Sequence, residues 1–91
     1  MNKTELIETF AARNDVSKNK AREMVDSFLE IFSDTLAYGE KIAIIGFGTF
    51  LPVQYSKRKT FNVQTGLPLE IPERRLVKFK MSKRLKAKMN P

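Results

Sequence analysis

The chain has 91 residues, with 17 Lys or Arg, 10 Asp or Glu and a formal net charge of +7, which indicates one small basic domain. It contains no cysteine and no histidine, which excludes disulfides, thiolate zinc sites and catalysis by a thiol or an imidazole. We therefore expect no enzymatic activity, no cofactor and no metal. Because it has neither a long apolar run nor the apolar segment of a signal peptide, we expect a cytoplasmic protein without a membrane partner.

A domain of this size buries only a modest share of its surface, so its stability margin is thin. Small domains usually compensate with disulfides, a structural metal or oligomerisation. Since the composition excludes disulfides and leaves only carboxylate ligands for a structural metal, oligomerisation is favoured. The large apolar residues available for it are Phe28, Phe32, Phe47, Phe50 and Phe79.

The charge is concentrated in the second half of the chain. Residues 1–41 carry six Lys or Arg and eight Asp or Glu, whereas residues 42–91 carry eleven and two, for net charges of −2 and +9. This asymmetry indicates a polyanionic partner, either nucleic acid, which we favour, or an anionic membrane surface. A metal-dependent nuclease would need clustered acids near this basic surface, and the second half holds only Glu70 and Glu73.

The first forty residues predict two amphipathic helices. Asn2 begins the first as a cap, and the helical pattern breaks at Asp15. Ser17 caps the second helix, and Gly39 is placed to end it. The pair is either a helix-turn-helix that reads the major groove or a structural pair that buries its facing sides; the acidic outer face of the second helix favours the structural pair.

The pattern then changes to strands. A β-branched segment at 42–45 is followed by a turn over 46–48 and a second strand over 49–55. Pro52 cannot donate to a strand ladder, so we expect it at an edge or a bulge. The chain returns as a third antiparallel strand over residues 75–80.

Residues 55–75 predict a β-hairpin arm. Both ends of this segment are basic, its flanks are rich in strand formers, and Gly66 lies among turn-forming residues. It has too few large apolar residues for a core of its own, which favours an arm that binds an elongated, acidic partner. After the third strand, Ser82 caps a short final helix whose faces are mostly cationic.

Four motifs occur in order along the whole chain: the segment from Met1 to Ile7, Gly46-Phe47-Gly48-Thr49-Phe50, Asn62-x-Gln64-Thr65-Gly66, and Phe79 followed by Ser82-Lys83-x-Leu85-Lys86. With these motifs, at this length, the chain resembles the HU and integration host factor family of bacterial histone-like proteins. The glycine-phenylalanine motif alone is a weak signal, whereas the ordered set is highly specific.

The resemblance implies an α+β fold with two N-terminal helices, a three-stranded antiparallel sheet with a long β-hairpin arm, and a short C-terminal helix. It also implies an intertwined dimer with a helical base, a saddle made of two sheets, and two arms that reach round the DNA minor groove. Within the single domain, we expect residues 1–40 to form the helical dimerisation region, 41–81 the sheet with arm 55–75, and 82–91 the C-terminal helix. Phe47, Phe50 and Phe79 match the aromatic residues of the subunit interface.

The implied function is that of a non-enzymatic architectural protein, associated with the nucleoid, that binds and bends duplex DNA through the minor groove with low sequence specificity. The expected partners are double-stranded DNA and a second copy of the chain or a paralogous subunit. Two alternatives are a sequence-preferring bending protein like integration host factor and an RNA-binding protein. The expected DNA-binding residues are Lys3, Lys57, Arg58, Lys59, Phe61, Asn62, Val63, Gln64, Thr65, Arg74, Arg75, Lys80, Lys83, Arg84 and Lys86.

The arm tip departs from the family pattern, which usually reads Arg-Asn-Pro-x-Thr-Gly with a proline that wedges between base pairs. Here Phe61 replaces the arginine and Val63 replaces the proline, while Tyr55 stands where the family often has another arginine. Apolar side chains of several types can unstack a base step, so we interpret Phe61 and Val63 as wedges. The alternative is that they pack on each other and stiffen the tip.

Overall fold

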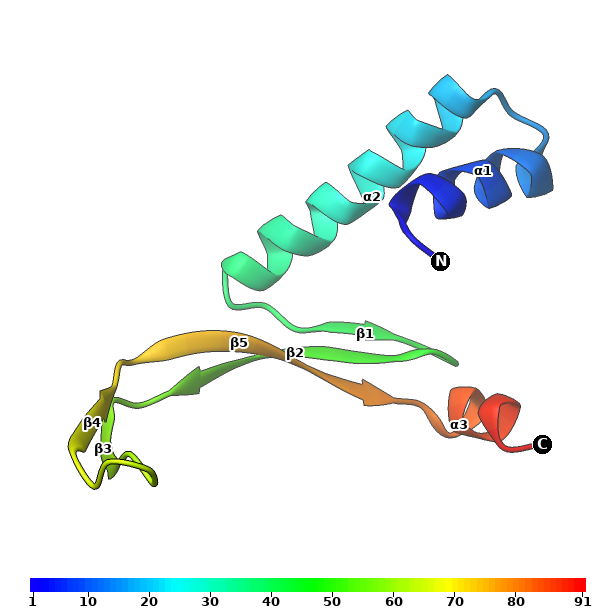
Figure 1. Ribbon diagram of the computed structural model, residues 1–91. Coiled ribbons are helices and arrows are strands. Elements are labelled where there is room, and N and C mark those ends of the chain that lie inside the picture. Colours follow the sequence, from blue (N-terminus) through cyan, green and yellow to red (C-terminus); the bar gives the residue numbers. More distant parts are fainter. The chain divides into compact units, whose positions relative to one another are not determined.

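The computed structural model describes residues 1–91 and consists of two compact units, Met1–Asp34 and Thr35–Pro91. The first unit contains α1 and most of α2, and the second contains the strands and α3 (Figure 1). In chain order the elements are α1 (Lys3–Asn14), α2 (Lys18–Ala37), β1 (Ile42–Ile44), β2 (Gly48–Tyr55), β3 (Arg58–Phe61), β4 (Pro68–Ile71), β5 (Arg74–Met81) and α3 (Lys83–Met89). This arrangement is the expected α+β fold.

The two long helices begin and end at the predicted residues. The Asn2 side chain accepts the Glu5 backbone N–H at 2.9 Å, and Asp15 ends α1 in a left-handed conformation. The Ser17 hydroxyl accepts the Lys20 backbone N–H at 3.1 Å at the start of α2. After α2, Gly39 has φ +94°, a conformation that costs glycine little. Local capping chemistry therefore sets the limits of both helices.

The facing sides of α1 and α2 form the buried core of the first unit. This core contains Ile7 and Ala11 from α1 and Ala21 and Val25 from α2. The pair thus buries its facing sides, as the structural-pair interpretation expects. None of the three helices combines the length and the apolar character needed to cross a bilayer.

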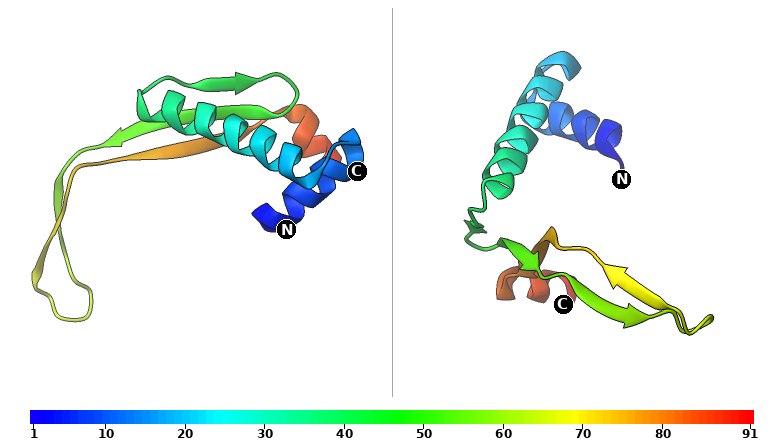
Figure 2. Two further views of the ribbon diagram at one scale, coloured as in Figure 1. Left: turned by 90° about the horizontal axis from the view of Figure 1, so that it is seen from above. Right: turned by 90° about the vertical axis from the view of Figure 1, so that its left-hand side faces the viewer.

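The second unit contains two antiparallel sheets. β1, β2 and β5 form a sheet in the order β1-β2-β5, and β3 and β4 form the arm hairpin, which continues the β2–β5 ribbon (Figure 2). Non-strand residues 56–57 and 72–73 separate the hairpin from the sheet. The arm expected as one hairpin over 55–75 is therefore interrupted at its base.

Pro52 lies at an unpaired edge of β2. It stands opposite Val77 of β5, whereas on the other side the pairing with β1 ends at Phe50. The prolyl nitrogen, which has no hydrogen to donate, is therefore tolerated where β2 has no partner on that side. This arrangement confirms the expected edge position.

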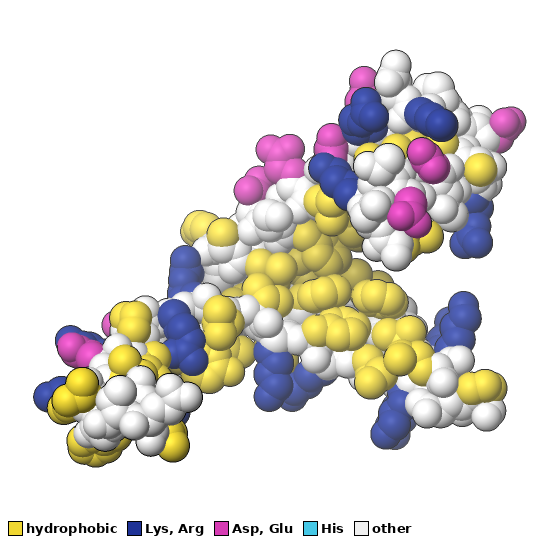
Figure 3. All heavy atoms as spheres, viewed as in Figure 1, with side chains coloured by type: hydrophobic (Ala, Val, Ile, Leu, Met, Phe, Trp, Pro, Cys, Tyr) yellow, Lys and Arg dark blue, Asp and Glu magenta, His cyan; other side chains and the backbone are white.

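The β2–β5 register separates the side chains of the sheet into two faces. Phe50 pairs with Phe79 on one face, and Leu51 pairs with Lys78 on the other. Phe47 joins the first face, where the three ring centroids lie 4.8–6.2 Å apart. Figure 3 shows hydrophobic side chains along one side of this sheet and Lys or Arg side chains projecting from the opposite side.

Gly48 allows the Phe79 ring to lie close to β2. A Cβ added at Gly48 would stand 2.6 Å from the Lys80 carbonyl oxygen and 2.6 Å from the Phe79 ring. The turn over residues 45–47, just before Gly48, fixes the start of α3, because the Ser82 backbone N–H donates to the Phe47 carbonyl oxygen at 2.9 Å. Ser82 also caps α3 by accepting the Leu85 backbone N–H at 3.1 Å.

The close approach at Gly48 predicts that Gly48→Ala lowers the free energy of unfolding by about 2–3 kcal/mol, because the ring and the strand backbone must both move. Gly39→Ala is the matched control, since nothing lies within 4 Å of its added Cβ; we expect it to cost only about 1 kcal/mol through its left-handed backbone. Urea unfolding at one protein concentration measures both. Equal losses in the two variants would contradict the packing role of Gly48.

Candidate nucleic-acid interface

The arm carries its cations on β3 and around its base. Lys57, Arg58 and Lys59 lie on the outgoing side and are exposed, and Arg75 is exposed on the returning strand. Arg74 is half-buried because its guanidinium stacks over the Tyr55 ring, with the Cζ atom 5.0 Å from the ring centroid. Tyr55 therefore holds a cation at the base of the arm.

Both acidic residues of the basic half contact other residues around the arm base. Glu70 of β4 pairs with Lys57, with 2.6 Å between Oε1 and Nζ. Glu73 accepts a hydrogen bond from the Gln54 side-chain amide. The first contact partly neutralises one of the expected phosphate-binding cations. Sequence reasoning missed these contacts, because they depend on how the two strands are aligned.

The turn at the arm tip is held by two of the residues expected to bind DNA. The Asn62 side-chain oxygen accepts the backbone N–H groups of Gln64 at 2.9 Å and Thr65 at 3.3 Å. The Thr65 hydroxyl accepts the Leu67 backbone N–H at 3.3 Å. Gly66 has φ +69° and donates to the Asn62 carbonyl oxygen at 2.8 Å. The side-chain oxygens of Asn62 and Thr65 thus shape the loop that presents the tip.

The two apolar residues that replace the family pattern project from this loop. Val63 is 100% exposed and Phe61 is 69% exposed. A fully exposed valine packs against nothing, so the interpretation in which Phe61 and Val63 pack on each other is wrong. Leu67 is also exposed, and the tip therefore presents an apolar surface to solvent.

A second group of cations lies at the other end of β5 and on α3. Lys80 lies on the sheet face opposite Phe79, and Lys83 and Lys86 are exposed on α3. The Arg84 side chain lies over the β1–β2 turn, where a Cβ added at Gly46 would stand 3.3 Å from its Nη1 atom. No carboxylate lies within ion-pair distance of these four cations.

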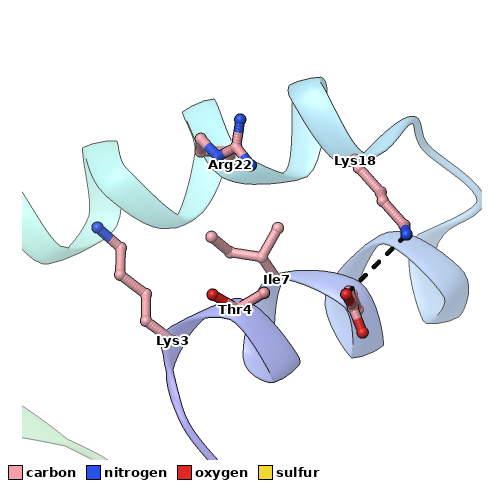
Figure 4. A pocket seen from close by; sticks show the side chains of 6 residues that line it. Lys3, Thr4, Ile7, Lys18 and Arg22 are labelled. Carbon is pink, nitrogen blue, oxygen red and sulfur yellow. Dashed lines mark ion pairs between the residues drawn. The ribbon is translucent and has the colours of Figure 1, made fainter.

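Lys3, the remaining expected site residue, belongs to the helical unit. Its Nζ atom lies 2.7 Å from the Asp26 carboxylate. It lines a pocket between α1 and α2 that also contains Lys18 and Arg22 (Figure 4). Because Lys18 stands 4.0 Å from Glu8, two of the three cations of this pocket are paired within the unit.

Comparisons with known proteins agree over the full length of the chain. The family model described as bacterial DNA-binding protein matches residues 1–90. DNA-binding protein HU of Thermotoga maritima is 42% identical over 89 residues, which is 98% of this chain and 99% of that protein. DNA-binding protein HU 1 of Bacillus subtilis is 45% identical over 86 residues, which is 94% of each chain.

Solved structures show the same similarity in three dimensions. The cocrystal structure of Anabaena HU with DNA has a TM-score of 0.88 at 31% identity and covers 100% of this chain and 99% of that one. HU from Thermotoga maritima has a TM-score of 0.68 at 32% identity, with 98% of each chain covered. The chain belongs to the HU and integration host factor family of bacterial DNA-binding proteins.

Proposed function

We propose that this chain is a non-enzymatic architectural protein that binds and bends duplex DNA through the minor groove with little sequence preference, and so compacts the nucleoid. The exposed basic arm with its apolar tip is the observation that carries this proposal. The family and the relatives support it, because the Thermotoga and Bacillus relatives are DNA-binding proteins and Anabaena HU was crystallised with DNA.

A second copy of the chain is the proposed subunit partner. The single chain buries only four hydrophobic residues, and all four belong to the helical unit. Phe28, Phe47 and Phe79 remain 54%, 44% and 42% exposed. Such exposure of large aromatic side chains marks an interaction surface, and a second copy would cover them. In this dimer residues 1–40 contribute the helical base, 41–81 the saddle and arm, and 82–91 the flanking helix.

The proposed DNA contacts fall into two groups. The arm cations would hold phosphates and line the groove, where the negative potential is strong, while Phe61 and Val63 would unstack a base step. Lys80 and the α3 cations would contact the flanking backbone, with Lys3 as a further contact from the helical unit. The arm contacts are Lys57, Arg58, Lys59, Asn62, Gln64, Thr65, Arg74 and Arg75, and those of the saddle are Lys80, Lys83, Arg84 and Lys86.

Titration with random-sequence duplex DNA at several salt concentrations tests the proposed function. Each phosphate contact adds roughly 0.9 to the slope of log affinity against log salt. Because the proposed dimer carries both residues twice, Lys83→Gln with Arg84→Gln should flatten the slope by up to roughly 3.6. Arg13→Gln with Lys20→Gln removes the same charge from the helical unit and should leave the slope nearly unchanged. An unaltered slope in the first variant would remove α3 from the interface.

The exposed tip predicts that bending depends on Val63 and Phe61. Fluorescence transfer across an end-labelled duplex should report a smaller bend with Val63→Ala, with Phe61→Ala, or with both, because an alanine is too small to hold a base step open. Binding through the cationic arm should persist in these variants, so the bend is compared at saturation. If both variants bend DNA as the parent does, the wedge assignment fails.

Removing the Lys57–Glu70 ion pair is predicted to raise the affinity for DNA. Glu70→Gln frees Lys57 for phosphate on both arms of the proposed dimer, so affinity at low salt should rise several-fold and the salt slope should steepen by up to roughly 1.8. Glu23→Gln is the matched control, because Glu23 also pairs with a lysine but lies on α2. Fluorescence anisotropy at several salt concentrations measures both quantities. An unchanged slope would mean that Lys57 does not contact the phosphates.

A further inference from the structure

The sheet face opposite the aromatic cluster carries an apolar strip among its cations. The β2–β5 register places Leu51 and Val53 of β2 and Leu76 of β5 on this face, with Val53 directly opposite Leu76. Leu51 and Val53 are half-buried, and Leu76 is 48% exposed. We call these three residues the outer strip. A charged partner alone does not explain three apolar side chains at this place.

Cations flank the outer strip at both ends. Lys78 lies opposite Leu51, with Lys80 two residues further along β5 on the same face. Arg74 lies at the other end, over Tyr55. An apolar strip between groups of cations is complementary to a ligand whose anionic edges border a less polar groove. The backbone edges and sugar walls of a nucleic-acid groove have this character, and the aromatic cluster on the opposite face is already assigned to the subunit interface.

We propose that the outer strip contacts the deoxyribose walls of the minor groove and selects duplex DNA over duplex RNA. This inference rests on the proposed minor-groove binding. The wide, shallow minor groove of duplex RNA displays a 2′-hydroxyl on every nucleotide. Leu51, Val53 and Leu76 would cover such hydroxyls without offering a hydrogen-bond partner, which is unfavourable, whereas deoxyribose has no hydroxyl at that position.

Covering one 2′-hydroxyl without a hydrogen-bond partner costs enough binding free energy to lower the affinity about tenfold. We therefore expect the wild-type chain to bind a DNA duplex at least about tenfold more tightly than the RNA duplex of the same sequence, at one salt concentration. A third duplex with 2′-fluoro sugars separates the hydroxyl from helix shape, because it keeps the RNA-like form without the hydroxyl. Its affinity should lie nearer to that of DNA.

The triple variant Leu51→Thr, Val53→Thr and Leu76→Thr tests the strip itself. Threonine favours strands and offers a hydroxyl partner, so the ratio of DNA to RNA affinity should fall toward one, mainly through tighter RNA binding. Leu76→Thr alone, at the most exposed of the three positions, should lower the ratio in the same direction if the triple variant melts early. Ile45→Thr, at a fully exposed turn residue, is the matched control and should keep the wild-type ratio.

Results contrary to these expected affinities would overturn different steps of the proposal. Equal affinity of the wild type for DNA and RNA, or an unchanged ratio in the threonine variants, would overturn selection by the outer strip. A 2′-fluoro duplex that binds as weakly as RNA would assign selection to helix shape and not to the hydroxyl. A wild-type chain that does not bind duplex DNA at all would overturn the proposed function itself.

Discussion

The unbroken ladder between β2 and β5 is the constraint on which both surfaces of the sheet depend. It runs without a bulge from Gly48 opposite Met81 to Tyr55 opposite Arg74, so alternate residues point to opposite faces along its whole length. A slip of one strand by one residue would exchange the faces of that strand, turning either Phe50 or Phe79 to the cationic side. Gly48 supports this register because the Phe79 ring occupies the space of a Cβ. One backbone alignment thus sets both the proposed subunit contact and the proposed DNA contact.

The apolar face that this ladder creates is not covered by other residues of its own unit. No large hydrophobic side chain of residues 35–91 is buried, although the three phenylalanine rings cluster there. In the proposed dimer the second copy supplies the missing cover, so association contributes to folding and the stability depends on protein concentration. The same association provides a second arm. Folding and a two-armed grip on DNA would then have one physical origin, namely an apolar face too large for one chain to bury.

Features that depend on a few neighbouring residues could be predicted from the sequence. Asn2 and Ser82 cap their helices, and Gly39 ends α2, because caps satisfy backbone groups close by in the chain. The interrupted arm base and the Lys57–Glu70 pair could not be predicted from the sequence, because they depend on how the strands are aligned. Likewise, the sequence predicts Gly48 in a turn over 46–48, whereas the turn occupies 45–47 and Gly48 begins β2, where the packed Phe79 ring explains why it must be glycine. The family motifs predicted the fold, whereas the exposure of Val63 required the structure.

Neighbouring aromatic and acidic residues determine how the cations of the arm are held. Where the family often has an arginine, Tyr55 instead holds the guanidinium of Arg74 in place at 5.0 Å, which restricts a flexible cation before it meets a ligand. Further along, Glu70 offsets Lys57, and the tip presents Phe61 and Val63. Contacts by cations release counterions and weaken as salt rises, whereas burial of apolar surface carries no such term. In an arm built this way, the tip would supply the part of the binding energy that persists at high ionic strength, and the base the part that depends on it.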